Sequence, residues 1–152
     1  METINHECYV SLEVAKLLKE AGFDWEVNTC RYNSSPDKVS SNGTLTSNFN
    51  GYAFQHIAIS APTLEVAQRW LREVKNCQIE IMYMYDKYGI NMGKYIGIYT
   101  VQDRIHGSLA DEESEQPIKL FEVYEKAQEA LEQKILTILL EEEQQNEETN
   151  LV

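Results

Sequence analysis

The sequence predicts an α+β fold, in which a small antiparallel or mixed sheet carries three helices packed mainly on one face. Two observations lead to this prediction. Apolar residues recur at helical spacing in three segments, and they alternate with polar residues in several of the segments between them. The resulting order is helix, strand, loop, strand, helix, hairpin, helix, without an internal repeat at a fixed period.

The first two helices have marked ends. Ser11 is expected to cap the first helix, and Gly22 to end it in the left-handed conformation. The apolar face of this helix comprises Val14, Leu17, Leu18 and Ala21. The second helix is expected over 63–75, because Pro62 stops the preceding segment and Thr63 can cap the next turn. Its buried face is predicted to contain Leu64, Ala67, Leu71 and Val74, with Trp70 at the edge.

The remaining segments of the first hundred residues predict strands and one long loop. Residues 25–32 are expected to form a short strand, and 34–50 a long polar loop or a weak hairpin. Residues 51–60 alternate around aromatic and β-branched side chains, which is typical of a strand. A hairpin follows, with strands at 78–85 and 94–101 around a glycine-containing turn.

The last third of the chain is predicted to end in the longest helix. Residues 102–116 are expected to form an acidic loop, 118–121 a short edge strand and 123–140 the helix. Leu136 and Leu140 lie off the main apolar face of this helix. We therefore predict that these two leucines form an exposed apolar surface for a partner.

Length and charge predict one domain with an acidic tail. A chain of 152 residues fits a single domain, expected over 1–140 with flexible loops at 33–50 and 102–117. The net charge is −12, and residues 111–152 hold 13 acidic residues against three basic ones. Residues 141–152 are rich in Glu, Gln and Asn, so we expect a disordered tail there.

The composition also excludes several classes of partner. An excess of negative charge argues against general nucleic-acid binding, which depends on Lys and Arg facing phosphates. No apolar run is long enough to span a membrane, and the polar, acidic N-terminal segment does not fit a secretory signal. The predicted location is the cytoplasm.

No residue pattern indicates a catalytic, metal or cofactor site. Cys8, Cys30 and Cys77 are far apart, which is typical of reduced, mostly buried thiols. His6 and Cys8 are two residues apart, but two ligands do not make a zinc site. The sequence contains no Walker loop, dinucleotide fingerprint, HExxH or GxSxG motif. We therefore predict no cofactor and no catalytic residue.

One region is a candidate for recognising a small ligand. Aromatic rings, an imidazole, a cation and a helix N-terminus converge there, and the candidates are Arg31, Tyr32, Tyr52, Phe54, His56, Ser60 and Thr63. The alternative is that the aromatic residues belong to the core and the polar ones to an ordinary surface. His56 and Ser60 would lie about 13 Å apart on one strand, too far for a catalytic pair.

Several runs of residues resemble a known group of proteins. The most specific are Ser60-Ala61-Pro62-Thr63-Leu64 and Gln68-Arg69-Trp70-Leu71-Arg72-Glu73. Together with segments 8–23 and 124–131, they make most of residues 8–140 similar to uncharacterised small proteins of gut anaerobic bacteria and their phages and prophages. The resemblance implies a phage-associated setting and no particular activity.

The sequence leaves two main functional hypotheses. The first is a non-catalytic accessory protein of phage or prophage origin that binds a host or phage protein, with a homodimer as a variant. The alternative is a small-molecule or nucleotide-binding domain that sequesters a host signal. An enzyme and an acidic mimic of DNA are less favoured.

Overall fold

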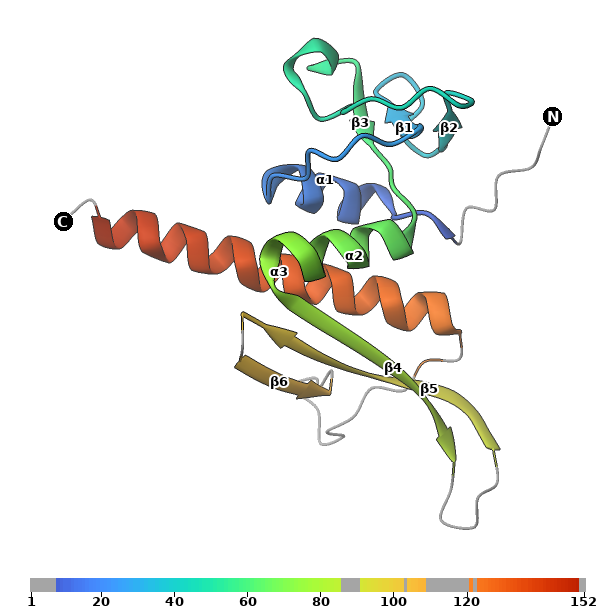
Figure 1. Ribbon diagram of the computed structural model, residues 1–152, viewed down its shortest axis with the longest axis vertical. Coiled ribbons are helices and arrows are strands. Elements are labelled where there is room, and N and C mark those ends of the chain that lie inside the picture. The colour runs from blue at the N-terminus through green and yellow to red at the C-terminus, as the bar shows by residue number, and fades with distance from the viewer. Residues whose placement is uncertain (1–7, 86–90, 103, 109–120, 122, 151–152) are drawn as a thin grey trace. The chain divides into compact units, whose positions relative to one another are not determined.

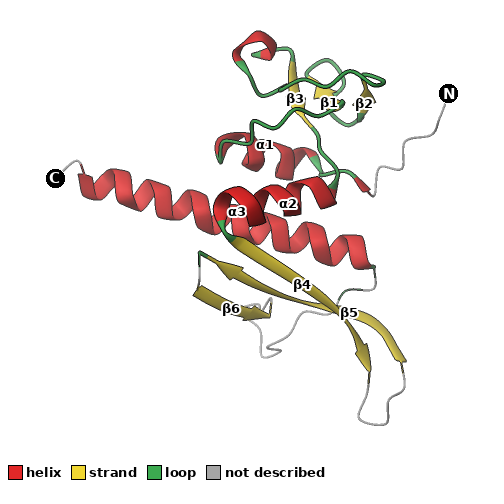
Figure 2. Cartoon of the chain, viewed as in Figure 1, coloured by secondary structure: helices red, strands yellow, loops and turns green. Residues whose placement is uncertain are grey.

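A computed structural model describes residues 8–85, 91–102, 104–108, 121 and 123–150. Helices and small antiparallel sheets confirm the α+β class (Figures 1 and 2). The chain forms two compact units where the sequence predicted one domain: residues 1–67 with 136–152 make the first unit, and 68–135 make the second. The chain leaves the first unit within helix α2 (Leu64–Lys75) and returns to it within helix α3 (Tyr124–Asn150).

The first unit contains helix α1 (Leu12–Glu20), whose two ends were predicted correctly. The Ser11 hydroxyl accepts a hydrogen bond from the Val14 N–H at 3.3 Å. At the other end Gly22 has a φ of +97°, and the Phe23 N–H donates to the Leu18 carbonyl at 2.9 Å. This is the pattern of a Schellman cap, and it returns the buried Phe23 ring to the helix.

A three-stranded antiparallel sheet completes the first unit. Strand β1 (Thr29–Tyr32) lies in the centre, between β2 (Ser40–Ser41) and β3 (Ala58–Ser60). Cys30 pairs with a residue of each neighbour. Strand β2 lies in the segment 34–50, which was expected to be a long loop or a weak hairpin, but it pairs with β1, outside that segment. Strand β1 is shorter than the strand expected over 25–32.

The strand expected over 51–60 is wrong for its first half. Residues Tyr52–Phe54 form a 3₁₀ turn, η2, and only β3 is extended. The Phe54 N–H donates to the Gly51 carbonyl at 3.1 Å, and the Phe54 ring packs on Phe49 with 4.8 Å between centroids. The alternating aromatic residues of this segment therefore belong to a turn that packs one ring against another, and not to a pleated strand.

The second unit contains a second antiparallel sheet, in the order β4 (Cys77–Tyr85), β5 (Asn91–Val101), β6 (Arg104–Ser108). The long β4–β5 hairpin confirms the predicted one (Figure 2). Strand β6 lies where the sequence predicted a loop over 102–116. Of the edge strand expected over 118–121, the structure describes Phe121, which bridges to Tyr95.

Helix α3 packs closely against strand β5 in the second unit. A Cβ added to Gly97 on β5 would lie 2.3 Å from Cδ1 of Leu131 on α3. Only glycine leaves room for the leucine at this distance.

On α2 the buried residues differ from the prediction: Trp70, expected at the edge, is 1% exposed, and Val74, expected to be buried, is 51% exposed. Burying the indole removes more apolar area from water than burying the valine does.

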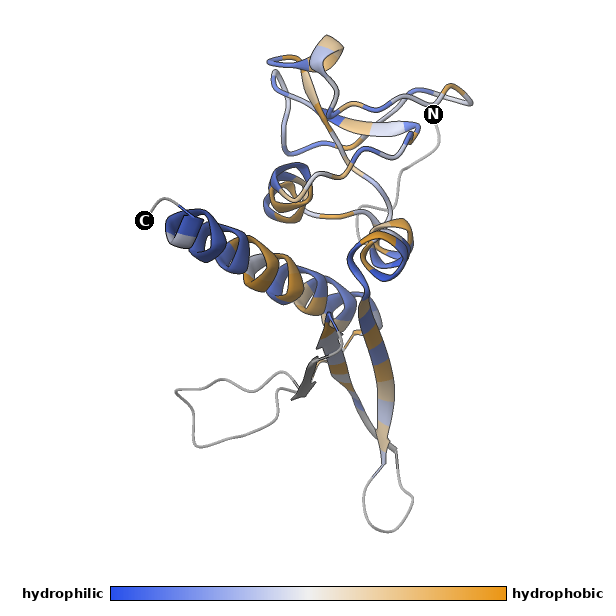
Figure 3. Ribbon diagram, turned by 60° about the vertical axis from the view of Figure 1, so that its left-hand side comes forward, coloured by the Kyte–Doolittle hydropathy of each residue, from blue (hydrophilic) through white to orange (hydrophobic). Residues whose placement is uncertain are grey.

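Helix α3 corrects two further predictions. It continues to Asn150, so residues 141–150 are helical where a disordered tail was expected. Its last turns consist mainly of Glu and Gln, which are good helix formers, and no Pro or Gly interrupts them (Figure 3). Leu136 is fully buried and Leu140 only partly exposed, so the expected apolar surface at Leu136 is not present.

Glu132 on α3 is a buried acid. Its side chain is fully buried, and neither carboxyl oxygen has a hydrogen-bond partner among the described residues. Burial, with a smaller contribution from the charge of Glu129, raises the pKa of this carboxyl well above its usual value. Because the pKa is higher in the folded protein than in the unfolded chain, stability falls as pH rises above the ordinary carboxyl range.

We therefore expect Glu132→Met to raise the free energy of unfolding at pH 7 by about 1–3 kcal/mol. The gain should shrink below about pH 4, where the unfolded chain is also protonated. Urea denaturation at several pH values measures this. Glu141→Met, at an exposed position of the same helix, is the control and should change little. A Glu132→Met protein with the same stability and pH profile as the native protein would contradict the expectation.

Candidate functional site

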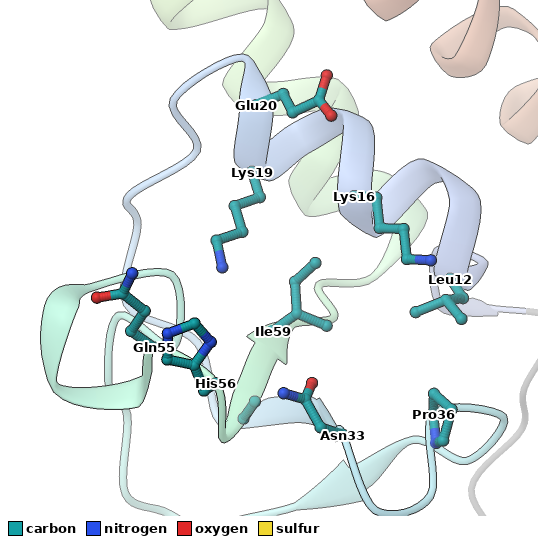
Figure 4. Close-up of a pocket in the computed structure, with 10 residues that line it drawn as sticks. Leu12, Lys16, Lys19, Glu20, Asn33, Pro36, Gln55, His56 and Ile59 are labelled. Atoms are coloured by element: carbon teal, nitrogen blue, oxygen red, sulfur yellow. The ribbon is translucent and has the colours of Figure 1, made fainter.

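A cleft of about 520 Å³ opens in the first unit, and we call it the α1–β3 cleft. Its size falls within the range of small-molecule sites. Helix α1 forms one wall, and the loop after β1 and the segment that enters β3 form the rest. The lining residues are Leu12, Lys16, Lys19, Glu20, Asn33, Pro36, Gln55, His56, Ala58 and Ile59 (Figure 4).

The helical wall follows from the amphipathic pattern of α1. Val14, Ala15 and Leu18 are buried. Lys16 and Lys19 lie on the exposed side of the helix, three residues and about one turn apart. Neither lysine forms an ion pair with any residue that the structure describes. Both ammonium groups are therefore available to the cleft.

The opposite wall is held by backbone hydrogen bonds. The Asn33 N–H donates to the Ile57 carbonyl at 2.9 Å, which joins the end of β1 to the start of β3. The Ile57 N–H donates to the Phe54 carbonyl at 2.9 Å and closes the turn after η2. Figure 4 shows that Lys19 and His56 point toward one another across the cleft, with Ile59 between the walls and Glu20 directed away.

His56 has a strained backbone. Its φ is +67°, in the left-handed region that non-glycine residues rarely adopt. The conformation costs about 1–2 kcal/mol for a residue with a Cβ. Strain of this kind persists where the surrounding structure imposes it, and it gathers at functional sites. Here it places an imidazole at the mouth of the cleft, opposite a lysine.

Arg31, a predicted ligand contact, does not line the cleft. It is 7% exposed, and its guanidinium donates to the Val10 carbonyl from Nη2 and to the Pro36 carbonyl from Nη1, both at 2.9 Å. Val10 lies just before α1, and Pro36 lines the cleft. Arg31 is thus a positioning residue, which ties the strand to the segments that carry two walls of the site.

Three other predicted site residues also have structural roles. Ser60 is fully buried on β3, where its N–H donates to the Asn50 side chain at 3.0 Å. The Thr63 hydroxyl accepts from the Val66 N–H at 3.2 Å and caps α2, so the helix start is occupied by its own side chain. Phe54 packs on Phe49.

Tyr52 and Tyr32 complete the set of predicted residues. Tyr52 is 92% exposed on η2 and does not line the cleft. Tyr32 is half-buried beside Cys30, and a hydrogen bond to that thiol raises the pKa of the Tyr32 phenol. Burial raises the pKa of the Cys30 thiol. Cys30 and Cys77 are buried, as expected of the cysteines, whereas Cys8 is exposed. Of the predicted ligand residues, His56 is the one that the cleft contains.

Lys16 and Lys19 are the residues that sequence reasoning missed. They carry a weak signal, since two lysines three apart on a polar helix face are common in solvated helices. The charge distribution gives the better signal. The segments of the first unit hold four Lys and Arg residues against 13 Asp and Glu, and two of these four cations line the cleft.

Comparisons with protein-family models, with curated proteins and with solved structures found no match. The described side chains include no group of three His, Cys, Asp or Glu residues placed to hold a metal ion. None of the helices in the described part of the chain combines the length and apolar character needed to cross a bilayer.

The role of Arg31 gives a stability prediction. We expect Arg31→Met to lower the free energy of unfolding by about 3 kcal/mol, because two carbonyls lose a charged donor inside the first unit. Chemical denaturation measures the change. Arg69→Met is the matched control: Arg69 is exposed and paired with Glu73 at 3.0 Å, so its loss should cost less than about 1 kcal/mol. Equal effects of the two substitutions would show that Arg31 does not hold the fold.

Proposed function

We propose that the first unit binds a small anionic molecule in the α1–β3 cleft. The observation that carries this proposal is the meeting of Lys16, Lys19 and His56 at one cleft, in a unit whose charge is otherwise strongly negative. Glu13 and Glu20 flank these lysines along α1, and Figure 4 shows that Glu20 is directed away from the cleft. Two lysines at one cleft, neither of them in an ion pair with a described carboxylate, favour an external anion.

The other lining residues define the kind of molecule. Each ammonium group supplies a compact charge with three donors, which suits a phosphate or carboxylate. Asn33 and Gln55 add amide groups that both donate and accept hydrogen bonds. Leu12, Ala58 and Ile59 provide apolar surface. We therefore favour an organic anion with an apolar or aromatic part, such as a mononucleotide, over a bare inorganic ion.

The proposed role is sequestration of a small host metabolite or signal by a phage-associated protein. A protein that sequesters a ligand needs to bind it but not to transform it. The lysines, the amide side chains and the apolar residues that line the cleft can supply this affinity. Protein binding is the second candidate. It loses the support of Leu136, which is buried.

The lysines provide the direct test. We expect nucleoside monophosphates to raise the melting temperature of the protein, and Lys16→Glu with Lys19→Glu to weaken binding at least tenfold, because attraction becomes repulsion. Thermal shift followed by calorimetric titration measures both effects. Lys126→Glu with Lys134→Glu is the control, since it makes the same charge change at two exposed helical lysines outside the cleft. Loss of affinity in both double variants, or no binding by the native protein, would overturn the proposal.

His56 allows a second test, in which stability and binding should respond differently. His56→Gly removes the left-handed strain, so stability should stay unchanged or rise by about 1 kcal/mol. Affinity for the anion should fall, because an imidazole donor is lost from the cleft. Asn76→Gly is the backbone control, since Asn76 also has a positive φ, of +55°, and lies outside the cleft. An unchanged affinity in His56→Gly would remove His56 from the proposed site.

A further inference from the structure

Leu12, Lys16 and Lys19, which line the α1–β3 cleft from α1, lie in one row along the helix. They are four and three residues apart, which is the spacing of neighbours on one helix face. A helix rises by about 10 Å between the first and the last of them, so the row follows the cleft over about that length. It begins with an apolar side chain and ends with a cationic one. The helical wall therefore differs in chemistry from one end to the other.

The two lysines of this row point toward opposite ends of the cleft. Figure 4 shows Lys19 directed across the cleft toward His56, whereas Lys16 is directed along α1 toward Leu12. The side chain of Ile59 lies between the two lysines in the same view. Two ammonium groups that hold one anion would converge on it, because each donates its own hydrogen bonds. Here they diverge, and each end of the cleft has its own positive charge.

The facing wall has two parts that match the two ends of the row. Gln55 and His56 lie opposite Lys19, and both carry groups that can donate a hydrogen bond to an anion (Figure 4). Pro36 lies opposite Leu12. One end of the cleft thus offers three polar side chains, and the other offers apolar surface beside a single ammonium group.

Separate hydrogen bonds fix the two parts of the facing wall. Arg31 donates from Nη1 to the Pro36 carbonyl at 2.9 Å. The Ile57 N–H donates to the Phe54 carbonyl at 2.9 Å and closes the turn that carries His56. The separation of the two ends is therefore set by the protein before a ligand arrives. A ligand whose charges match this separation gains affinity from the preorganised wall.

We propose that the cleft binds a molecule with an anionic group at each end, an inference that rests on the proposed binding of an organic anion. One anionic group lies between Lys19 and His56, and the other contacts Lys16. Asn33 and Ile59 line the interval, which suits a body with both polar and apolar surface. A nucleoside with phosphates at its 3′ and 5′ positions has this chemistry.

A chain of adjacent phosphates fits the cleft less well. Such a chain concentrates its charge at one end, beside Lys19 or beside Lys16, and leaves the other lysine next to an uncharged part of the ligand. Attraction between exposed charges falls with distance and is screened by salt. A phosphate beside each lysine is therefore held more firmly than two phosphates beside one lysine. The position of the charge on the ligand, more than its amount, should decide affinity.

Two isomeric nucleotides test the proposal on the full chain. Adenosine 3′,5′-bisphosphate separates its two phosphates, whereas adenosine 5′-diphosphate joins them at one end. Calorimetric titration of the native protein should give an affinity about tenfold higher for the 3′,5′-bisphosphate. Equal affinities, or tighter binding of the 5′-diphosphate, would overturn the proposal, because the amount of charge would then account for binding.

Single substitutions show whether both lysines create this preference. Lys16→Gln and Lys19→Gln should each remove it, because one of the two separated phosphates then loses its cation. Lys126→Gln, at an exposed lysine outside the cleft, is the control and should keep the preference. Circular dichroism checks that the variants are folded like the native protein. A preference for the 3′,5′-bisphosphate that survives in Lys16→Gln or in Lys19→Gln would overturn the proposal.

A third nucleotide, adenosine 5′-monophosphate, separates the failure of this proposal from that of the proposed function. If the monophosphate binds and the 3′,5′-bisphosphate has no advantage over its isomer, the cleft is an anion site and its division into two charged ends is wrong. If none of the three nucleotides binds, the proposed function is wrong, and the two-ended ligand is wrong with it.

Discussion

The buried guanidinium of Arg31 is the interaction on which the first unit depends. A charged group inside a protein is tolerated when hydrogen bonds replace those it made to water, and here Nη2 and Nη1 donate to the carbonyls of Val10 and Pro36. These two carbonyls belong to segments far from each other along the chain. By holding both to β1, Arg31 fixes the beginning of α1 and the loop that faces it across the cleft.

The α1–β3 cleft combines this rigid support with local strain and unbalanced charge. His56 keeps a left-handed backbone that a small loop would normally assign to glycine or asparagine. Lys16 and Lys19 add positive charge to a unit that is otherwise acidic. Each feature is costly or neutral for folding alone, and their meeting at one cleft is what favours a binding role.

In the second unit the constraints come from close packing and from the sheet edge. Gly97 permits Leu131 to reach the sheet, and the amides of Gln68 and Gln128 protect the beginning of β4.

The sequence by itself determined the class of fold, the ends of α1, the β4–β5 hairpin and the capping role of Thr63, because these follow from local periodicity and backbone chemistry. Tertiary structure decided the rest. Whether Arg31 faces inward, whether Tyr52–Phe54 forms a turn and which lysines meet His56 all depend on contacts between distant segments. The local sequence pattern indicates the face of a helix or strand on which a residue lies, but only tertiary packing determines which residues it contacts.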